Sequence, residues 1–359
     1  MSEFPSVRPA IDELDVASVA EALRSGHLEE GDYVREFEQS LAKFLSKPYG
    51  QATTNGFSAI HVLLQALRVR SGDEIILPSY CCPSVLYPIK LVGATPVFAD
   101  IGPDSFNINL ETISRVYSRR TRLVILPYHF GFPTDIDAIV DQFGQERVIE
   151  DIAQSLGVEY KGKQLGSYTY HAVASFYATK MITSGDGGMV FMQDEGVYES
   201  AKRLTYYGAR RGHEVIGYNY HLTNLNAALG LSQFRKLGEF IARRKRIGQI
   251  YKSHLAEIPD IQTDFAFSDQ AAFLKYPILL PNQRMRDCLK QRLAERKVQC
   301  GFGVLEPLHI KEGLTNSTMP NTMKFAHNIL CLPIYPSMSD TDAAYVSRTL
   351  IDLYKVSNL

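Results

Sequence analysis

Six short apolar runs, separated by helix-like segments, constrain the fold of this 359-residue chain more than any other feature. The runs lie at residues 75–77, 96–98, 123–127, 148–150, 172–176 and 189–191. Most of them lack the polar and apolar alternation of a strand with one solvated face, so we expect strands covered on both faces. Because these strands alternate with helical segments, such as residues 57–67, the pattern predicts a mainly parallel α/β sheet.

The pattern changes after about residue 255, and the C-terminal part is typical of a smaller α+β unit. Strands are expected at residues 273–280, 298–301 and 329–332, and helices at residues 284–296 and 340–353. Thr223 suits the N-cap of a helix that starts at Asn224 and runs through Leu237 into the basic stretch 243–246. We therefore expect a large domain over residues 1–240 and a small α+β domain over residues 241–359. We allow for packing of the N-terminal segment on the small domain.

Charge and composition argue against several classes of partner. Lysine and arginine total 38 and aspartate and glutamate total 39, so the formal net charge is −1. Nucleic acid polymers and anionic membranes are therefore not expected as partners. The basic stretch 243–246 is short, and we interpret it as a solvated helix face.

Localisation is predicted from what the chain lacks. It has no run of 18 apolar residues, and its N-terminus lacks the basic and apolar regions of a secretion signal. Its five scattered cysteines contain no CxxC motif. They favour free thiols in a reducing cytoplasm over disulfides or a metal site.

The strongest candidate for chemistry is a lysine that follows the run at 172–176. Lys180 ends the segment 175–180 (SFYATK) and precedes a glycine-rich turn at 183–188. Most lysines are exposed, so a surface lysine in a turn is the ordinary interpretation. The alternative is a partly buried amine that forms a Schiff base with a carbonyl cofactor or substrate. The spacing alone leaves both interpretations open.

A carboxylate and a glycine-containing turn are the other candidates. Asp151 follows a buried strand, at the sheet edge where α/β proteins bind ligands, and could hold a cationic ring nitrogen. A helix N-cap is the alternative for Asp151, and Glu150 competes for the role but still belongs to the strand pattern. Asn55 and Gly56 precede the helix at 57–67, where free amide groups favour a phosphate. A simple helix cap is the better interpretation of that pair alone.

Motifs along nearly the whole chain resemble the DegT/DnrJ/EryC1/StrS family of pyridoxal-phosphate-dependent sugar aminotransferases, which have the aspartate aminotransferase-like fold. These motifs are Ser25-Gly26 with Gly31, Asn55-Gly56, and the segments 72–79, 93–97, 150–154, 175–188, 218–224 and 332–333. The resemblance implies a three-layer αβα large domain around a mainly parallel mixed sheet. It also implies pyridoxal 5'-phosphate as the cofactor.

The resemblance assigns a role to each matching residue. Lys180 would form the internal aldimine and later shuttle a proton, and Asp151 would pair with the pyridine nitrogen. The other cofactor contacts would come from Gln154 at the ring or its phenolic oxygen, from Ser175 and the backbone amides of Gly56 and Phe57 at the phosphate, and from Asn219 at the phosphate in the neighbouring subunit. Because Asn219 would act across an interface, a homodimer is implied.

The chain departs from the family pattern at two cofactor positions. Phe57 stands where the family usually has threonine, which leaves Ser58 as the candidate replacement for the lost hydroxyl. Cys82 takes the place of an aromatic residue that often stacks on the cofactor. Cys82 can still pack on the ring, but it covers less area.

A third departure concerns the substrate. His221 stands where the family commonly has arginine, and Arg210 and Arg211 in the preceding loop could compensate. The candidates for substrate binding are His27, Tyr33, His129, Tyr207, His221 and His309.

The implied activity is transfer of an amino group from glutamate or glutamine, through pyridoxamine phosphate, to a keto sugar that is nucleotide-linked in most of the family. Two alternatives stay open. Sugar dehydratases of this fold use pyridoxamine phosphate, but several replace the lysine by histidine, which Lys180 argues against. A cofactor-binding regulator without turnover is the second alternative, because Phe57, Cys82 and His221 depart from the family pattern.

Overall fold

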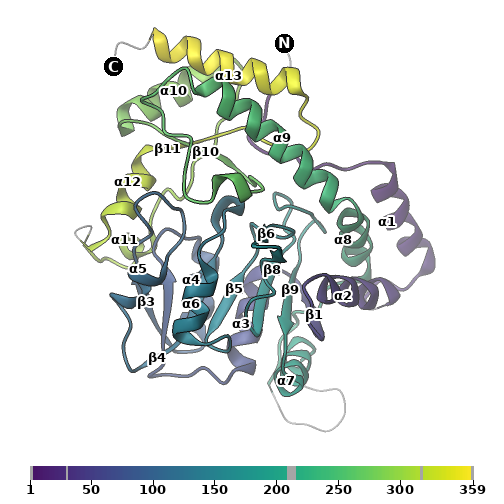
Figure 1. Cartoon of the computed structure of the whole chain (residues 1–359). Helices are drawn as coiled ribbons and strands as arrows, with labels where there is room; N and C mark the ends of the chain where they lie inside the picture. The colour runs from purple at the N-terminus through teal and green to yellow at the C-terminus, as the bar shows by residue number, and fades with distance from the viewer. Residues whose placement is uncertain (1–2, 30, 208–215, 316–317, 357–359) are drawn as a thin grey trace.

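The computed structural model describes residues 3–29, 31–207, 216–315 and 318–356 of the chain. Its centre is a seven-stranded sheet with the strand order β1-β9-β8-β5-β4-β2-β3 (Figure 1). The strands are β1 (Tyr49–Thr53), β2 (Glu74–Pro78), β3 (Thr95–Ala99), β4 (Thr121–Pro127), β5 (Val148–Asp151), β8 (His171–Ser175) and β9 (Gly188–Met192). Neighbouring strands pair in parallel from β3 to β8, whereas β9 runs antiparallel to both β8 and β1. The predicted mainly parallel mixed sheet is confirmed.

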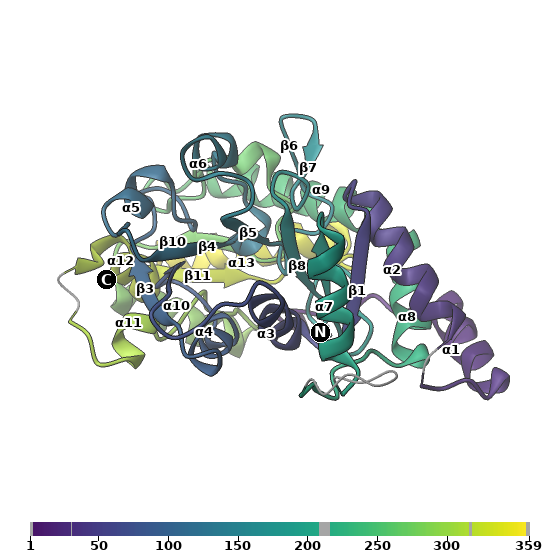
Figure 2. The ribbon, with the colours of Figure 1, turned by 90° about the horizontal axis from the view of Figure 1, so that it is seen from below.

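Helices cover both faces of this sheet, which explains the uninterrupted apolar runs. Within β4, Leu123 and Ile125 belong to one hydrophobic cluster, and Val124 and Leu126 belong to another. Successive side chains of a strand point to opposite faces, so a strand buried on both faces is apolar at every position. Figure 2 shows α3 (Gly56–Ala66), α4 (Pro83–Leu91) and α7 (Glu195–Thr205) on one side of the sheet, and α5 (Leu110–Ser114) and α6 (Ile136–Phe143) on the other.

The C-terminal part has a core of its own. Strands β10 (Tyr276–Leu279) and β11 (Ile329–Leu332) pair antiparallel. They share a hydrophobic cluster with residues of α9 (Leu237–Leu255), α10 (Gln283–Glu295) and α13 (Asp340–Lys355). Phe4 joins this cluster, and its backbone exchanges hydrogen bonds with Lys297 and Gln299. The N-terminal segment therefore packs against the C-terminal part, while a domain division at residue 240 stays a prediction.

The remaining elements are α1 (Glu13–Ser25), α2 (Asp32–Phe44), α8 (Asn224–Arg235), α11 (Leu308–Lys311), α12 (Pro320–Asn328), the hairpin β6 (Glu159–Tyr160) and β7 (Lys163–Gln164), and two 3-10 turns, His129–Gly131 and Ser268–Gln270.

Two predicted C-terminal strands differ from the structure. The expected strand at 273–280 is shortened to β10, because Phe273 has a left-handed backbone with φ of 52°. The expected strand at 298–301 does not form. Val298 bridges only to Phe4, and Gly301 bridges only to Cys331, so no continuous ladder exists.

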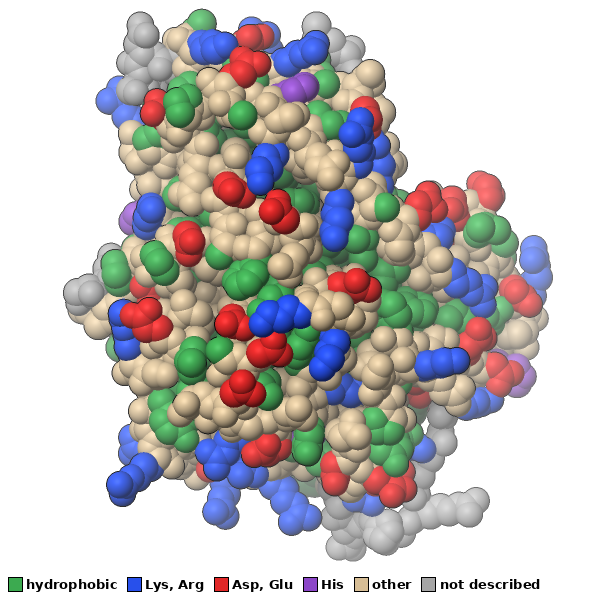
Figure 3. Space-filling model, in the orientation of Figure 1, with side chains coloured by type: hydrophobic (Ala, Val, Ile, Leu, Met, Phe, Trp, Pro, Cys, Tyr) green, Lys and Arg blue, Asp and Glu red, His purple; other side chains and the backbone are tan. Residues whose placement is uncertain are grey.

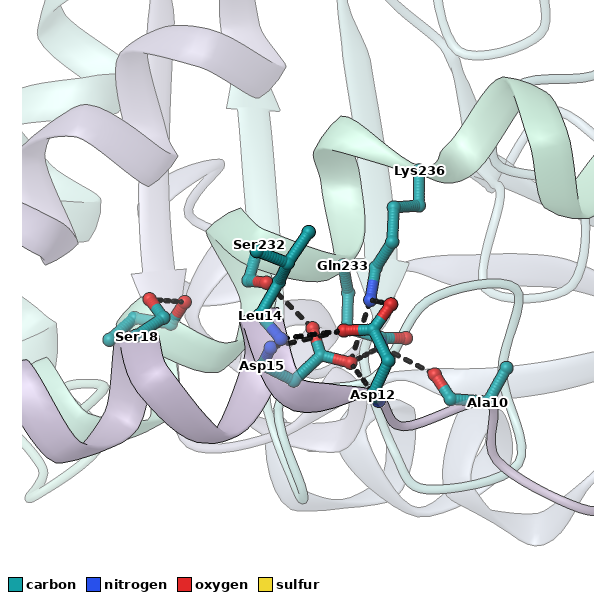
Figure 4. A network of polar contacts seen from close by, with 9 residues as sticks. Ala10, Asp12, Leu14, Asp15, Ser18, Ser232, Gln233 and Lys236 are labelled. Carbon is teal, nitrogen blue, oxygen red and sulfur yellow. Dashed lines mark hydrogen bonds and ion pairs between the residues drawn. The ribbon is translucent and has the colours of Figure 1, made fainter.

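The helix expected to continue from Asn224 through Leu237 is broken at Lys236. Thr223 caps α8 as predicted, but α8 ends at Arg235 and α9 begins at Leu237. The Lys236 ammonium lies 2.8 Å from a carboxylate oxygen of Asp12 and 2.7 Å from one of Asp15 (Figure 4).

Asp15, at 1% exposure, is the centre of this polar network. Its carboxylate also accepts hydrogen bonds from Ser232 Oγ (2.6 Å) and Gln233 Nε2 (2.8 Å). The hydrogen bond from Lys236 holds the pKa of Asp12 below its ordinary value. The start of α1 is thereby fastened to the junction of α8 and α9.

The interpretation of the basic stretch 243–246 as a solvated helix face is wrong for two of its residues. Arg244 is 2% exposed, and its guanidinium donates to the carbonyl oxygens of Phe273, Leu274 and Ile334. Arg243 donates to Met338 O at 2.8 Å. Arg243 also pairs with the Asp340 carboxylate at 2.5 Å. These contacts join α9 to neighbouring loops of the C-terminal part.

Acidic and basic side chains are interspersed over most of the face shown in Figure 3. No helix among the described residues has both the length and the apolar composition needed to cross a membrane. The described histidine, cysteine, aspartate and glutamate residues form no group of three or more that could hold a metal ion. All five cysteines are free thiols.

Candidate functional site

Two neighbouring cavities meet at Lys180. The larger has a volume of about 540 Å³ and the smaller about 350 Å³, and Cys82, Thr179 and Lys180 line both. The smaller cavity lies where β5 and β8 end and α3 begins, as expected for the carboxyl edge of a parallel sheet. The larger cavity extends from Lys180 to residues 274–275, 301–306 and 331–332 of the C-terminal part.

The smaller cavity contains a set of donors suited to a phosphate. Asn55 caps α3 by accepting a hydrogen bond from Ser58 N. The backbone amides of Gly56 and Phe57, in the first turn of α3, have no hydrogen-bond acceptor among the described residues. A Cβ atom on Gly56 would lie 2.9 Å from Ser175 Cβ, so only glycine permits this close approach of α3 to β8. Free amides, the positive end of a helix and a serine hydroxyl fit a phosphate group.

Asp151 lies in the wall of the same cavity. It ends β5, is nearly fully buried, and accepts a hydrogen bond from Ala153 N at 2.9 Å. Burial raises the pKa of its carboxyl group, while that hydrogen bond and the positive charge of Lys180 act in the opposite direction. A cationic ring nitrogen placed in this cavity would therefore stabilise the carboxylate.

Glu150, the competing carboxylate, points to the other face of the sheet. It is fully buried and accepts hydrogen bonds from Tyr128 Oη and from the amides of Gly166 and Tyr168. The preference for Asp151 agrees with this placement, because adjacent strand residues face opposite sides.

Lys180 is partly buried between the two cavities. Its backbone amide donates to Tyr177 O at 2.9 Å, in the turn that follows β8. Burial lowers the pKa of its ammonium group, and the positive charge of Lys275 adds to this effect. Lys180 lines both cavities, which distinguishes it from an ordinary surface lysine.

Gln154 and His129 lie side by side in the wall of the larger cavity. Gln154 Oε1 accepts a hydrogen bond from Phe130 N at 2.9 Å, and Gln154 Nε2 lies 3.4 Å from His129 Nδ1. Burial lowers the pKa of His129 to about 3, so its imidazole is neutral at pH 7. These two residues offer neutral polar groups to a ligand.

Cys82 is exposed, whereas its neighbour Cys81 is buried. Cys82 lines both cavities, as expected for a residue that packs on a bound ring.

Ser58 was expected to reach the phosphate-binding cavity, but it does not line it. Its side chain is buried, and its hydroxyl donates to Asn55 Oδ1 at 3.0 Å and contacts Thr54 Oγ1 at 3.0 Å. These contacts belong to the cap of α3. The hydroxyl therefore does not replace the threonine that Phe57 displaces.

His309 is not brought to either cavity. It is 0% exposed, and its Nδ1 lies 2.5 Å from Ser79 Oγ. The structure does not support contact between this side chain and a substrate, because the protein encloses the imidazole.

Five predicted residues lie away from both cavities of the chain. His27, Tyr207 and Asn219 are exposed, whereas Tyr33 and His221 are partly buried. His221 Nε2 lies 3.4 Å from a carboxylate oxygen of Glu29, so the segments around these two residues are adjacent. Arg210 and Arg211 lie outside the described residues.

Lys275 was not predicted as a site residue, although it lines the larger cavity. It precedes β10 directly, and its Nζ donates to Phe302 O at 2.9 Å. No motif marks it, because the expected strand at 273–280 offered only an apolar pattern. The contact with Phe302 depends on two segments that are distant in the sequence.

Comparison with known proteins connects this geometry to a family. The model of the DegT/DnrJ/EryC1/StrS aminotransferase family matches residues 9–351. GDP-perosamine synthase from Escherichia coli O157:H7 is 28% identical over 366 residues, which cover 99% of both chains. The aminotransferase TlmJ from Streptoalloteichus hindustanus has a TM-score of 0.92 at 25% identity, with 99% of both chains covered.

A further structure shows the same fold. The PLP form of Spr1654 from Streptococcus pneumoniae has a TM-score of 0.91 at 24% identity, with 99% of both chains covered. The family match spans nearly the whole chain, and the fold agrees with it. The chain belongs to the DegT/DnrJ/EryC1/StrS aminotransferase family.

Proposed function

We propose that this chain transfers an amino group from glutamate or glutamine to a keto sugar that is linked to a nucleotide. Membership of the family makes it a pyridoxal-phosphate-dependent sugar aminotransferase. The donor, the sugar and the residue roles are part of the proposal. The main support for the proposal is the position of Lys180. Lys180 lies between the cavity that we propose for the phosphate and a larger cavity with room for a sugar.

The smaller cavity fits pyridoxal phosphate. The amides of Gly56 and Phe57 and the hydroxyl of Ser175 would hold the phosphate, and Asp151 would hold the protonated ring nitrogen. Gln154 and Cys82 would contact the ring from the side of the larger cavity. When bound, the cofactor supplies an aldehyde that combines with amines and a ring that takes up electron density from the substrate carbon.

Lys180 performs two tasks in the proposed mechanism. Because burial lowers the pKa of its amine, a larger share of Nζ is neutral, which is the form that attacks a carbonyl carbon or accepts a proton. We assign to Nζ the proton that leaves the substrate carbon and is delivered to the neighbouring cofactor carbon. Asp151 favours this transfer by keeping the ring nitrogen positively charged.

A homodimer is part of the proposal. Asn219 and Tyr207 are exposed and line neither cavity of their own chain. A second copy is needed to bring Asn219 to a phosphate, and the same holds for substrate contacts by His27, Tyr33, Tyr207 and His221. The free thiols of all five cysteines support a cytoplasmic location, where thiols stay reduced.

The substrate class rests on the relatives. One of them is named GDP-perosamine synthase, after a nucleotide-linked amino sugar. The cavity of about 540 Å³ beside Lys180 is within the range of small-molecule sites. A keto sugar is therefore the proposed acceptor of the amino group.

The test is the visible absorption spectrum of the purified protein with added pyridoxal phosphate, before and after glutamate or glutamine. We expect a band of lysine-bound cofactor that bleaches as pyridoxamine phosphate forms. A band that neither glutamate nor glutamine changes would refute the proposed donors and favour the regulator without turnover. Formation of a keto sugar from a hydroxylated sugar nucleotide, with loss of water, would favour a dehydratase.

A further inference from the structure

Lys275 places a second ammonium group in the wall of the larger cavity. Its Nζ donates one hydrogen bond to Phe302 O at 2.9 Å, and it lies 5.6 Å from the centre of the Phe130 ring. An ammonium group has three donors, so two remain for a ligand. The hydrogen bond to a backbone carbonyl fixes the position of this charge before any ligand arrives.

The two lysines of the cavity differ in their surroundings, because the charge of Lys180 is partly balanced by Asp151 and Lys275 has no such partner among the described carboxylates. Among the described residues that line the larger cavity, Lys180 and Lys275 are cations, and His129 is neutral at pH 7. Glu306 also lines it, but this residue is exposed and lies 3.5 Å from the ammonium of Lys311. No described carboxylate forms an ion pair with Lys275.

The other residues of the cavity wall offer little negative charge to balance Lys275. Leu274, Phe302, Leu305 and Leu332 contribute apolar surface. A partly buried cation without a counter-ion favours an anionic ligand, because the ligand restores the interactions that burial removed. Lys180 and Lys275 line the same cavity, and the charge of Lys275 contributes to the lowered pKa of Lys180.

We propose that Lys275 binds the carboxylate of the amino donor that is attached to the reacting carbon. This inference rests on the proposed function. In glutamate and glutamine that carboxylate is one bond from the carbon whose amine is transferred, so it must lie close to Lys180. A diphosphate in the acceptor is separated from its keto carbon by the sugar ring, and it would extend farther from the reacting carbon.

The residue acts as a binding and specificity determinant in this scheme. A charge-assisted hydrogen bond between an ammonium and a carboxylate is stronger than a neutral one. The acceptor half of the reaction leaves Lys275 without its carboxylate, so its removal should affect the donor half selectively.

The experiment uses the holoenzyme and 2-methylglutamate, which carries both carboxylates but has no proton on the reacting carbon. Its dissociation constant is measured from the change in the cofactor spectrum. In Lys275→Met we expect a rise of about 10- to 100-fold, as for loss of one hydrogen bond to a charged group. Lys275→Gln keeps a donor for Phe302 O but loses the charge, and it should show a similar rise if Lys275→Met does not fold.

Two further variants separate charge from packing. Lys275→Arg should lose less affinity than Lys275→Met, because arginine keeps a positive charge that can donate to a carboxylate. Lys290 also lies over the Phe302 ring, at 4.8 Å from its centre, but does not line the cavity. Lys290→Met should therefore bind 2-methylglutamate as the unmodified protein does.

Unchanged affinity in both Lys275→Met and Lys275→Gln would overturn the inference. Weaker binding of a nucleoside diphosphate, with 2-methylglutamate unaffected, would overturn it in favour of an acceptor phosphate. The proposed function has a separate test. If glutamate and glutamine leave the cofactor spectrum of the unmodified protein unchanged, the proposed function is refuted without any comparison of variants.

Discussion

Replacement of Gly56 by alanine tests the proposed phosphate site, because two opposing effects can be estimated from the structure. Gly56 has an ordinary helical backbone at the start of α3. Alanine at such a position usually stabilises a protein by about 0.4–1 kcal/mol. Its Cβ, however, would lie 2.9 Å from Ser175 Cβ, a distance that side chains essentially never adopt.

The clash with Ser175 should cost more than alanine gains by restricting the unfolded chain. Overpacking a tight contact costs about 1–3 kcal/mol, so after the gain is subtracted we expect a net loss of up to about 2.6 kcal/mol in unfolding free energy. The larger effect concerns the cofactor, because α3 and Ser175 must separate and the proposed phosphate donors come from both. Loss of one hydrogen bond to a charged group costs about 1.5–3 kcal/mol, which is a 10- to 100-fold weaker affinity for pyridoxal phosphate.

The assay is a spectroscopic titration of the cofactor-free protein with pyridoxal phosphate, together with urea unfolding. Gly238→Ala is the matched control, because a Cβ at this helical glycine of α9 would meet nothing within 4 Å. The control should gain about 0.4–1 kcal/mol in stability and keep its cofactor affinity. Unchanged affinity for pyridoxal phosphate in Gly56→Ala would refute the assignment of the phosphate to the site between α3 and Ser175.

Three further predictions concern Lys180, Asn219 and His129. Lys180→Ala should lose the visible band of lysine-bound cofactor, and an unchanged band would exclude Lys180 as the residue that binds the aldehyde. Asn219→Ala should lower cofactor affinity, and mixed dimers with Lys180→Ala chains should regain a fraction of the activity; no recovery would argue against a shared site. The pKa of His129 falls from 6.5 to about 3 on folding, so its contribution to stability is lost as the pH falls below about 6.5. In urea unfolding, His129→Gln should reduce the loss between pH 7 and pH 4 by up to about 3 kcal/mol, and an equal loss in both proteins would contradict this.

The sheet was predictable because its strands are buried on both faces. All six apolar runs became strands of the central sheet. The edge strand β1 (Tyr49–Thr53) was missed because its sequence, YGQAT, has no apolar run. Pairing with β9 makes it a strand, and that interaction is not visible in the local pattern.

The candidate site was predictable where a residue sits at a fixed place relative to a strand or helix end. Asp151, Ser175, Gly56 and Lys180 all belong to this class, and all line the smaller cavity. Lys275 does not belong to it, because its position depends on packing between distant segments.

Other errors arose where a side chain has several available partners. Ser58 is occupied by the cap of α3, and His309 is enclosed beside Ser79. Arg244 donates to carbonyl groups of two loops that cannot be identified from a basic stretch. In each case the residue type was compatible with the predicted role. Local cap contacts decided against it for Ser58, and tertiary contacts did so for His309 and Arg244.

The ion pairs of Lys236 with Asp12 and Asp15 have a mechanical consequence. They lie where the helical path changes from α8 to α9, and they fasten α1 to that joint. A change in the angle between α8 and α9 must either break the largely buried ion pair of Lys236 with Asp15, at a cost of several kcal/mol, or move α1 together with α9. The loop after α1 is tied in turn to Asn224 at the start of α8, through its contact with His27 O. A tilt of the C-terminal part against the sheet would thus be transmitted to the exposed residues 27–29.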